Sequence, residues 1–214
     1  MVKVLGIDEA GKGPVIGPMI IAGVMIEEGT EDLLGEVKDS KLLTHGKRMQ
    51  LDKQIRGVSD FKIIEVSPQE IDNALLSQSS NLNWLEAQKQ AEIINELQPD
   101  KAIIDCPSTN CEAYEKYLKN LLINKDIELI VEHKADMNYP TCSAASILAK
   151  VVREERMDEI RQKYGEVGAG YPSDPKTKKF VKENWFRHPE IFRRTWSTYK
   201  RVAEGKGQKK LSGF

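Results

Sequence analysis

Four acids stand at positions where a folded chain often places its chemistry. Asp8 and Glu9 are adjacent, and they follow an apolar run and precede a glycine-rich loop at 11–18. Asp105 also ends an apolar run, and Asp136 lies just ahead of a stretch of small residues. The carboxyl ends of buried strands are where open α/β sheets usually carry their sites. These four carboxylates are therefore the candidate catalytic groups.

If the four acids converge, they favour metal chemistry. Carboxylates at close range repel one another and need cations to stay ionised. Oxygen ligands suit Mg²⁺ or Mn²⁺ rather than zinc, and two such ions about 4 Å apart serve in-line displacement at a phosphodiester. Alternatively, each acid caps a helix or a turn. Neighbours on an extended strand point to opposite faces, so Asp8 and Glu9 share a site only if the strand ends or twists there. Sequence spacing leaves this convergence open.

Composition indicates a globular chain of 214 residues, with 40% hydrophobic and 30% charged residues and no apolar run of membrane-spanning length. The N-terminus enters a strand pattern without a signal-peptide core. Three cysteines without a CxxC pair argue against a disulfide framework or a zinc site. We therefore expect a reducing, cytoplasmic setting and no membrane association.

The net charge of −1 hides a strong asymmetry along the chain. Residues 150–214 carry 17 basic and 9 acidic side chains, whereas residues 1–149 carry 15 and 24. An acidic part suits metal ions, and a basic part suits a polyanion. The alternative is a solvated helical surface that happens to be basic.

Apolar periodicity predicts an α/β fold with a sheet that is at least partly parallel, because strands alternate with helices. The predicted strands are 2–7, 19–26, 61–66, 101–105 and 127–132. The predicted helices are 46–57, 83–98, 111–122 and 139–165, with two shorter ones in KTKKFVKENWF and near WSTYKRVAEG. We expect a catalytic domain at 1–165, a helical extension packed on it at 166–204, and a flexible tail at 205–214.

Five ordered motifs resemble one known family, ribonuclease HII (type 2 ribonuclease H), and especially its archaeal members. The resemblance runs from residue 2 to about residue 200. The motifs are GIDEAGKGPVIGP (6–18), DSKLLT (39–44), IIDCPS (103–108), EHKADMNYPTCSAASILAKVVR (132–153) and GAGYPSDP (168–175).

The resemblance implies a ribonuclease H-like mixed sheet flanked by helices, followed by a helical C-terminal part. It implies hydrolysis of the RNA strand of RNA–DNA hybrids and nicking 5′ of single ribonucleotides in duplex DNA, giving 3′-hydroxyl and 5′-phosphate ends. Two Mg²⁺ or Mn²⁺ ions would be held by Asp8, Glu9, Asp105 and Asp136, with Asp8 bridging them. Ribonucleotide excision repair and DNA replication are the implied settings.

The resemblance also assigns substrate contacts. The family loop Gly-Arg-Gly, which uses backbone groups to recognise the ribonucleotide 2′-hydroxyl, here reads Gly11-Lys12-Gly13. Lysine keeps the charge but loses the planar fork of arginine, so a guanidinium-specific phosphate contact is not expected. Tyr171 matches a tyrosine that stacks on the neighbouring deoxyribose and contacts that hydroxyl. The further substrate-binding candidates are Lys41, Ser143, Ser146, Lys150 and Arg194.

Several other residues receive a structural interpretation instead. Ser143 and Ser146 also permit close helix packing, and Trp196 is interpreted as core rather than as a stacking platform. His133 lies close enough to Asp136 in sequence to assist proton transfer, but no histidine is assigned a catalytic role.

The last residues resemble a sliding-clamp (PCNA) interaction motif, with Gln208, Leu211 and Phe214 at its key spacings. We expect a monomer that binds hybrid duplexes and the clamp. Three other hypotheses remain: a non-catalytic hybrid-binding module, a nucleotide-binding α/β protein, and a type 3 ribonuclease H. The nucleotide-binding hypothesis is weakened by the lack of GxxxxGK[ST]. Type 3 members usually carry an extra N-terminal domain.

Overall fold

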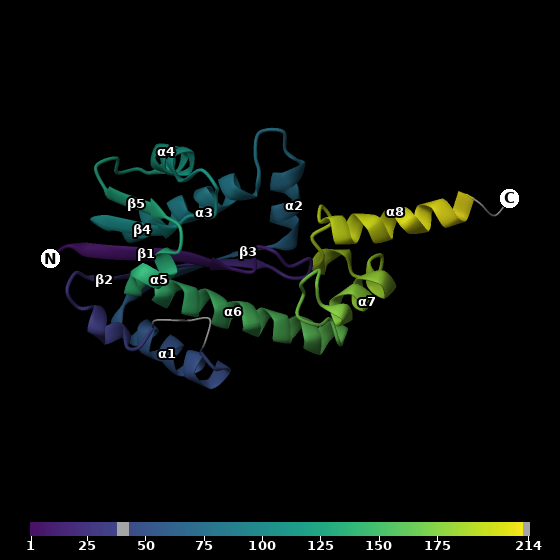
Figure 1. Ribbon diagram of the computed structural model, residues 1–214, viewed down its shortest axis with the longest axis horizontal. Helices are drawn as coiled ribbons and strands as arrows, with labels where there is room; N and C mark the ends of the chain where they lie inside the picture. The colour runs from purple at the N-terminus through teal and green to yellow at the C-terminus, as the bar shows by residue number, and fades with distance from the viewer. Residues whose placement is uncertain (38–42, 212–214) are drawn as a thin grey trace. The chain divides into compact units, whose positions relative to one another are not determined.

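A single five-stranded sheet organises the computed structural model, which describes residues 1–37 and 43–211 (Figure 1). Lys41 and Phe214 lie outside the described residues. The strand order is β3-β2-β1-β4-β5. The central strand β1 pairs antiparallel with β2 and parallel with β4, and β4 pairs parallel with β5. The strands are β1 (Lys3–Ala10), β2 (Met19–Glu27), β3 (Asp60–Val66), β4 (Lys101–Asp105) and β5 (Glu128–Glu132). The predicted mixed α/β sheet is confirmed.

Helices fill the connections between and after the strands. They are η1 (Glu31–Leu34), α1 (His45–Val58), α2 (Pro68–Leu76), α3 (Leu82–Leu97), α4 (Cys111–Leu121), α5 (Ala135–Asn138), α6 (Pro140–Tyr164), α7 (Pro175–Asn184), η2 (Pro189–Ile191) and α8 (Ser197–Leu211). The predicted long helices are confirmed to within two residues. In the described parts of the chain, no helix is long and apolar enough to cross a membrane.

Helix α2 was not predicted, although the sequence carries its signal. Ser67 caps its N-terminus by accepting from the backbone N–H of Glu70, and the Glu70 side chain accepts from the Ser67 N–H. Pro68 occupies the first helical position, where its missing N–H costs nothing. This reciprocal capping box is readable as S-x-x-E and defines where the helix begins.

The described chain divides into two compact units that are not contiguous in sequence. The first unit comprises 1–10, 20–65 and 82–152, and the second comprises 11–19, 66–81 and 153–214. This grouping differs from the boundary predicted at residue 165, because two short N-terminal segments join the C-terminal residues. The predicted flexible tail also overlaps the last turns of α8, which continues to Leu211.

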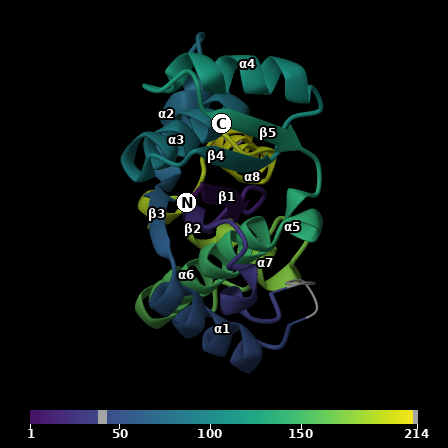
Figure 2. The ribbon, with the colours of Figure 1, turned by 90° about the vertical axis from the view of Figure 1, so that its left-hand side faces the viewer.

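In the first unit, helices cover both faces of the sheet. Helices α3 and α4 lie on one face, and α1 with the first half of α6 lies on the other (Figures 1 and 2). The second face is filled by apolar residues of β2 and α1 packed against residues 144–149 of α6, three of which are alanines. Gly6 lets β1 approach α6 closely, since a Cβ there would lie 2.3 Å from the backbone nitrogen of Cys142. The small residues therefore bring α6 against the strand that carries Asp8.

In the second unit, a separate apolar core joins its three segments. Val15 and Ile16 pack with residues of α7 and with Phe192 and Tyr199. Ile16 forms a β-bridge with Phe192, and the backbone N–H of Val15 donates to the carbonyl of Gly170 at 2.8 Å. Trp196 is half-buried against this core, which confirms its interpretation as a packing residue. The loop after β1 is thus built into the core of the second unit.

Candidate active site

Three of the four predicted acids come together in the first unit. Ligand oxygens of Asp8, Asp105 and Asp136 all lie within 4.8 Å of one another. The parallel register explains the first pair, because Ile7 lies beside Ile104 and the next residues are the two acids. Asp136 belongs to α5, which begins directly after the neighbouring parallel strand β5. The cluster therefore forms where three adjacent strands end, and two of its acids, Asp8 and Asp105, are the ones that the sequence places at strand ends.

Asp8 is the most perturbed acid of the cluster. It is 6% exposed, and burial raises its pKa to about 6, with the charge of Asp105 adding to the rise. Hydrogen bonds from Ser146 and from the Glu9 N–H, at 2.7 Å to Oδ1, act in the opposite direction. Lys150 also lowers this pKa, and its Nζ donates to the Ser146 hydroxyl at 2.8 Å. Helix α6 thus supplies Lys150, which donates to Ser146, and Ser146, which donates to the buried Asp8 carboxylate.

The other two acids are fixed by the backbone around α5. The N–H of Ala135 donates to Asp105 Oδ1 at 3.3 Å. The Ser143 hydroxyl donates to the backbone carbonyl of Asp136, so α6 also holds the turn that carries this acid. Ser143 and Ser146, which were predicted as substrate-binding, are both almost fully buried and support the cluster.

Glu9 lies in β1 next to Asp8 but outside this cluster. Side chains alternate along a strand, and β1 continues in regular pairing with β2 as far as Ala10. The backbone position of Glu9 therefore faces away from that of Asp8, and its charge is among the causes, after burial and Glu86, that raise the pKa of Tyr114. Its role as a metal ligand stays a prediction.

The chemistry of the cluster fits a hard divalent cation. Its three donors are carboxylates, Asp8 and Asp136 are nine-tenths buried, and together they place negative charge in a poorly solvated position. Such a site is electrostatically unfavourable without a cation, and Mg²⁺ and Mn²⁺ prefer oxygen ligands of this kind.

The glycine-rich loop after β1 is held from behind by a buried arginine. Arg193 is fully buried, and its guanidinium donates to the carbonyls of Gly11 at 2.6 Å, Lys12 at 2.7 Å and Gly17 at 3.1 Å. The Trp196 indole N–H donates to the carbonyl of Gly13 at 3.0 Å. A planar fork with five N–H donors is suited to several carbonyls at once.

A second arginine reaches the same loop from α6. Arg153 donates to the carbonyls of Ile16, at 3.2 Å, and Pro18. It also packs against Gly11, where a Cβ would lie 2.5 Å from the Arg153 Cδ. Gly11 has a φ of +86°, which side-chain-bearing residues rarely adopt. Glycine at this position is therefore required by both the backbone and the arginine.

These donors orient the amides of the loop. In a trans peptide the carbonyl and the following N–H point in opposite directions, and the described chain has no cis peptide. With the carbonyls of Gly11 and Lys12 directed at Arg193, the N–H groups of Lys12 and Gly13 point away from it. The loop thus presents consecutive N–H donors on its other side, an arrangement that suits an anion or a hydroxyl.

Tyr171 lies beside this loop within the second unit. A Cβ on Gly13 would be 3.8 Å from the Tyr171 Cε1, and Tyr171 is 44% exposed. Asp174 shapes the turn below it by accepting from the backbone N–H groups of Ala169 and Lys176. The structure therefore places Tyr171 beside Gly13 of the loop, and the substrate contacts of Gly11, Lys12, Gly13 and Tyr171 stay a prediction.

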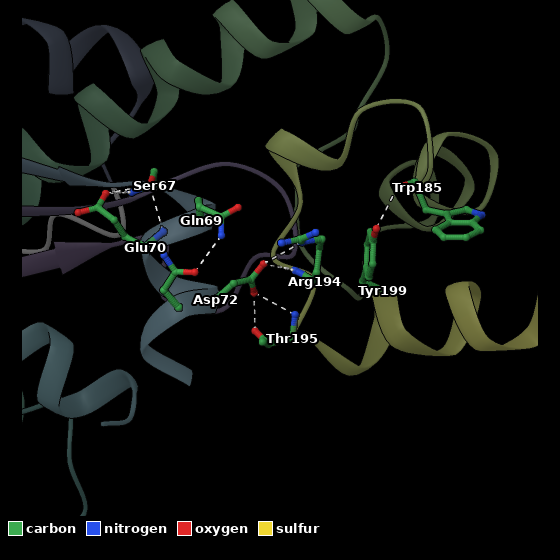
Figure 3. A network of polar contacts seen from close by, with 9 residues as sticks. Ser67, Gln69, Glu70, Asp72, Trp185, Arg194, Thr195 and Tyr199 are labelled. Atoms are coloured by element: carbon green, nitrogen blue, oxygen red, sulfur yellow. Dashed lines mark hydrogen bonds and ion pairs between the residues drawn. The ribbon is translucent and has the colours of Figure 1, made fainter. Parts of the chain in front are cut away.

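Arg194 has a structural partner that the sequence did not suggest. Asp72 of α2 is almost fully buried and accepts from the backbone N–H groups of Arg194 at 2.8 Å and Thr195 at 2.9 Å (Figure 3). The Thr195 hydroxyl donates to the same carboxylate, and the Arg194 Nε lies 3.6 Å from it. This network anchors the segment that carries Arg193. A substrate contact of Arg194 stays a prediction.

A family model described as Ribonuclease HII matches residues 5–199. The Ribonuclease HII of Pyrococcus furiosus is 44% identical, over 97% of this chain and 94% of its own length. The Ribonuclease HII of Thermococcus onnurineus is 42% identical, over 99% of this chain and 95% of its own.

Solved structures agree with this likeness. Ribonuclease H2 from Pyrococcus horikoshii superposes with a TM-score of 0.86 at 40% identity, covering 95% of this chain and 98% of that one. A PCNA:RNase HII complex from Archaeoglobus fulgidus gives 0.81 at 38% identity, covering 92% and 96%. Bst-RNase HIII in complex with Mn²⁺ shares the fold, with a TM-score of 0.73 at 19% identity and 97% and 71% coverage.

Proposed function

This chain belongs to the ribonuclease HII family, and from that premise we propose that it nicks duplex DNA on the 5′ side of a single embedded ribonucleotide. Membership of the family makes it a ribonuclease H, a hydrolase that cleaves the RNA strand of RNA–DNA hybrids. The observation that carries the proposal is the meeting of Asp8, Asp105 and Asp136 at the ends of three strands.

We propose that the cluster binds two divalent ions, Mg²⁺ or Mn²⁺, with Glu9 completing the ligand set. When bound, two such ions activate the attacking water and stabilise the leaving oxygen, which gives 3′-hydroxyl and 5′-phosphate ends. The protein contributes orientation. Ser146 and Lys150 hold the Asp8 carboxylate, and the Ala135 N–H holds that of Asp105.

Recognition of the ribonucleotide is proposed for the loop 11–13 and Tyr171. A 2′-hydroxyl both donates and accepts hydrogen bonds, so it distinguishes RNA from DNA at one position. The outward N–H groups of Lys12 and Gly13 can only donate, whereas the Tyr171 phenol can also accept and offers a ring to a sugar. The lysine side chain adds a point charge for phosphate, together with Lys41 and Lys150.

Sliding-clamp binding is proposed for the C-terminal motif. Support comes from the spacing of Gln208, Leu211 and Phe214 and from the likeness to a ribonuclease HII that was solved in complex with PCNA. A pull-down with the clamp should recover the full chain and lose a chain ending at 207. The Phe214→Ala variant should also fail to bind the clamp, whereas the Lys209→Ala variant should still be recovered with it. Equal recovery of all forms would contradict the proposal.

The central experiment uses a labelled DNA duplex that carries one ribonucleotide. We expect a nick on its 5′ side with Mg²⁺ or Mn²⁺, and no product in EDTA. Asp136→Asn should abolish cleavage while retaining salt-dependent binding, and Asp60→Asn, an exposed acid of β3, should cleave normally.

Two outcomes would change the proposal. Cleavage of a long hybrid without a nick at the single ribonucleotide would remove the roles given to Tyr171 and the glycine loop. Binding without cleavage of either substrate would favour a hybrid-binding module. Roles in ribonucleotide excision repair and DNA replication in the cytoplasm follow only if the nick is observed.

A further inference from the structure

Two cysteines and a histidine form a second cluster of ligand atoms in the first unit. The sulfurs of Cys106 and Cys111 and a ring nitrogen of His133 all lie within 4.8 Å of one another. The cysteines bracket the turn between β4 and α4, and His133 follows the parallel neighbour strand β5. The sequence argued against a zinc site because its three cysteines include no CxxC pair. The cluster became visible only in the structure, since its third ligand, His133, follows another strand.

One separation within the cluster is close to the one that a zinc ion sets. Zinc binds sulfur at about 2.3 Å and histidine nitrogen at about 2.0–2.1 Å with tetrahedral angles, which sets a sulfur–nitrogen separation of about 3.6 Å. Cys111 Sγ lies 3.4 Å from His133 Nε2. Only a few tenths of an ångström separate this pair from the geometry of a bound ion.

The far side of the imidazole is already fixed as in a metal site. His133 Nδ1 lies 3.3 Å from the backbone carbonyl of Cys106, which can only accept, so Nδ1 carries the proton and Nε2 offers its lone pair to the cluster. Metal-binding histidines are commonly held this way, by a carbonyl on the second nitrogen. In the metal-free chain the Cys106 thiol donates to the Ser108 carbonyl at 3.3 Å, a hydrogen bond that is given up when the thiol loses its proton.

We propose that Cys106, Cys111 and His133 bind one Zn²⁺ ion, with water as the fourth ligand. Both thiols release their protons to solvent on binding, and the two thiolates balance the charge of the ion. Sulfur and imidazole ligands select zinc over Mg²⁺, whereas the neighbouring aspartates offer oxygen alone. The site is therefore separate from the carboxylate cluster, although Cys106 follows Asp105 directly.

The position of the ion gives it a structural effect on the active site. Zinc would tie the turn after β4 to the end of β5, the two strands whose ends carry Asp105 and lead to Asp136. Because the ion binds the folded chain, it should raise the thermal midpoint by about 5–10 °C at 100 times its dissociation constant.

The test measures bound zinc in the full chain, kept in a non-thiol reductant with excess Mg²⁺. After equilibration with Zn²⁺ and desalting, native mass spectrometry should find one zinc on the wild type. Cys111→Ser and His133→Ala should bind more than about 100-fold more weakly. Matched controls are Cys142→Ser, at a buried cysteine outside the cluster, and His45→Ala, at an exposed histidine of α1. Both should keep the ion.

Cobalt provides a second readout, independent of activity. Co²⁺ in the wild type should show sulfur-to-metal charge-transfer absorption that Cys111→Ser weakens and Asp136→Asn leaves intact. Zinc retained by both cluster variants, or lost in Asp136→Asn, would overturn the proposal. So would a Cys106–Cys111 disulfide that persists in the reductant, since it removes both sulfur ligands.

Discussion

Replacing Asp8 by asparagine should make the metal-free protein more stable. The pKa of Asp8 rises from 3.8 to about 6 in the folded chain, mainly through burial. A rise of this size corresponds to about 3 kcal/mol of free energy against the ionised carboxylate. Asparagine has nearly the same shape and can still accept from the Glu9 N–H. In EDTA at pH 8, Asp8→Asn should therefore raise the thermal midpoint by about 6–12 °C.

The pH dependence follows from the direction of the shift. A raised pKa means that the folded chain holds the Asp8 proton more tightly than the unfolded chain does. Burial of Asp8 therefore lowers the free energy of unfolding of the wild type least at low pH. The wild type loses stability as the pH rises through about 6. At pH 4 the advantage of Asp8→Asn should shrink to about 0.5 kcal/mol. Adding Mg²⁺ at pH 8 should stabilise the wild type more than the variant, because the ion binds the ionised carboxylate.

The assay is thermal unfolding, monitored by circular dichroism, at pH 4 and pH 8 and with and without EDTA. Asp60→Asn removes the same charge at an exposed position and should show no pH-dependent gain. The reasoning would be refuted if Asp8→Asn is no more stable than the wild type at pH 8 in EDTA, or if its advantage is the same at pH 4. In either case burial would not destabilise the ionised Asp8 carboxylate.

Three further substitutions test the support of the site. Gly6→Ala should cost more than about 2 kcal/mol in urea unfolding, because its Cβ would meet the Cys142 backbone at 2.3 Å; an unchanged midpoint would contradict the close packing. Arg193→Lys should lose about 3 kcal/mol and slow cleavage, since one ammonium nitrogen cannot take the places of three guanidinium nitrogens that each donate to a different carbonyl; wild-type stability and rate would refute this. Asp72→Asn should cost about 1–2 kcal/mol, measured by the same unfolding, and no loss would make its network incidental.

The sheet and the placement of two acids were predictable, because both depend on local patterns. Apolar, β-branched runs define the strands, and Asp8 and Asp105 each stand at the end of one. Parallel register then brings these ends side by side without further information. Asp136 was a candidate from its place ahead of the small-residue stretch, but its position in space was not predictable, since α5 is too short to be identified from periodicity.

What the sequence could not show depends on contacts between distant residues. In the pair Arg193-Arg194, the residue assigned to substrate is the half-exposed one, and its neighbour is buried under the glycine loop. The β-bridge between Ile16 and Phe192, which are far apart in the chain, sets the position of the segment so that the Arg193 side chain is the buried one. Glu9 was assigned to the metal site by the family resemblance, and because it alternates with Asp8 along β1, its role as a ligand stays a prediction.

The buried contact between Arg193 and Gly11 also bears on how the protein is made. The two residues are 182 positions apart, so at 5–20 residues per second the loop emerges from the ribosome about 9–36 s before its support exists. The strands that carry Asp8 and Asp105 can pair earlier, because all their partners precede residue 133. The last acid of the cluster, Asp136, precedes Arg193 by 57 residues, so during synthesis the acids are all present about 3–11 s before the loop is supported. A chain terminated between these two residues should therefore lack the Arg193 support of loop 11–18.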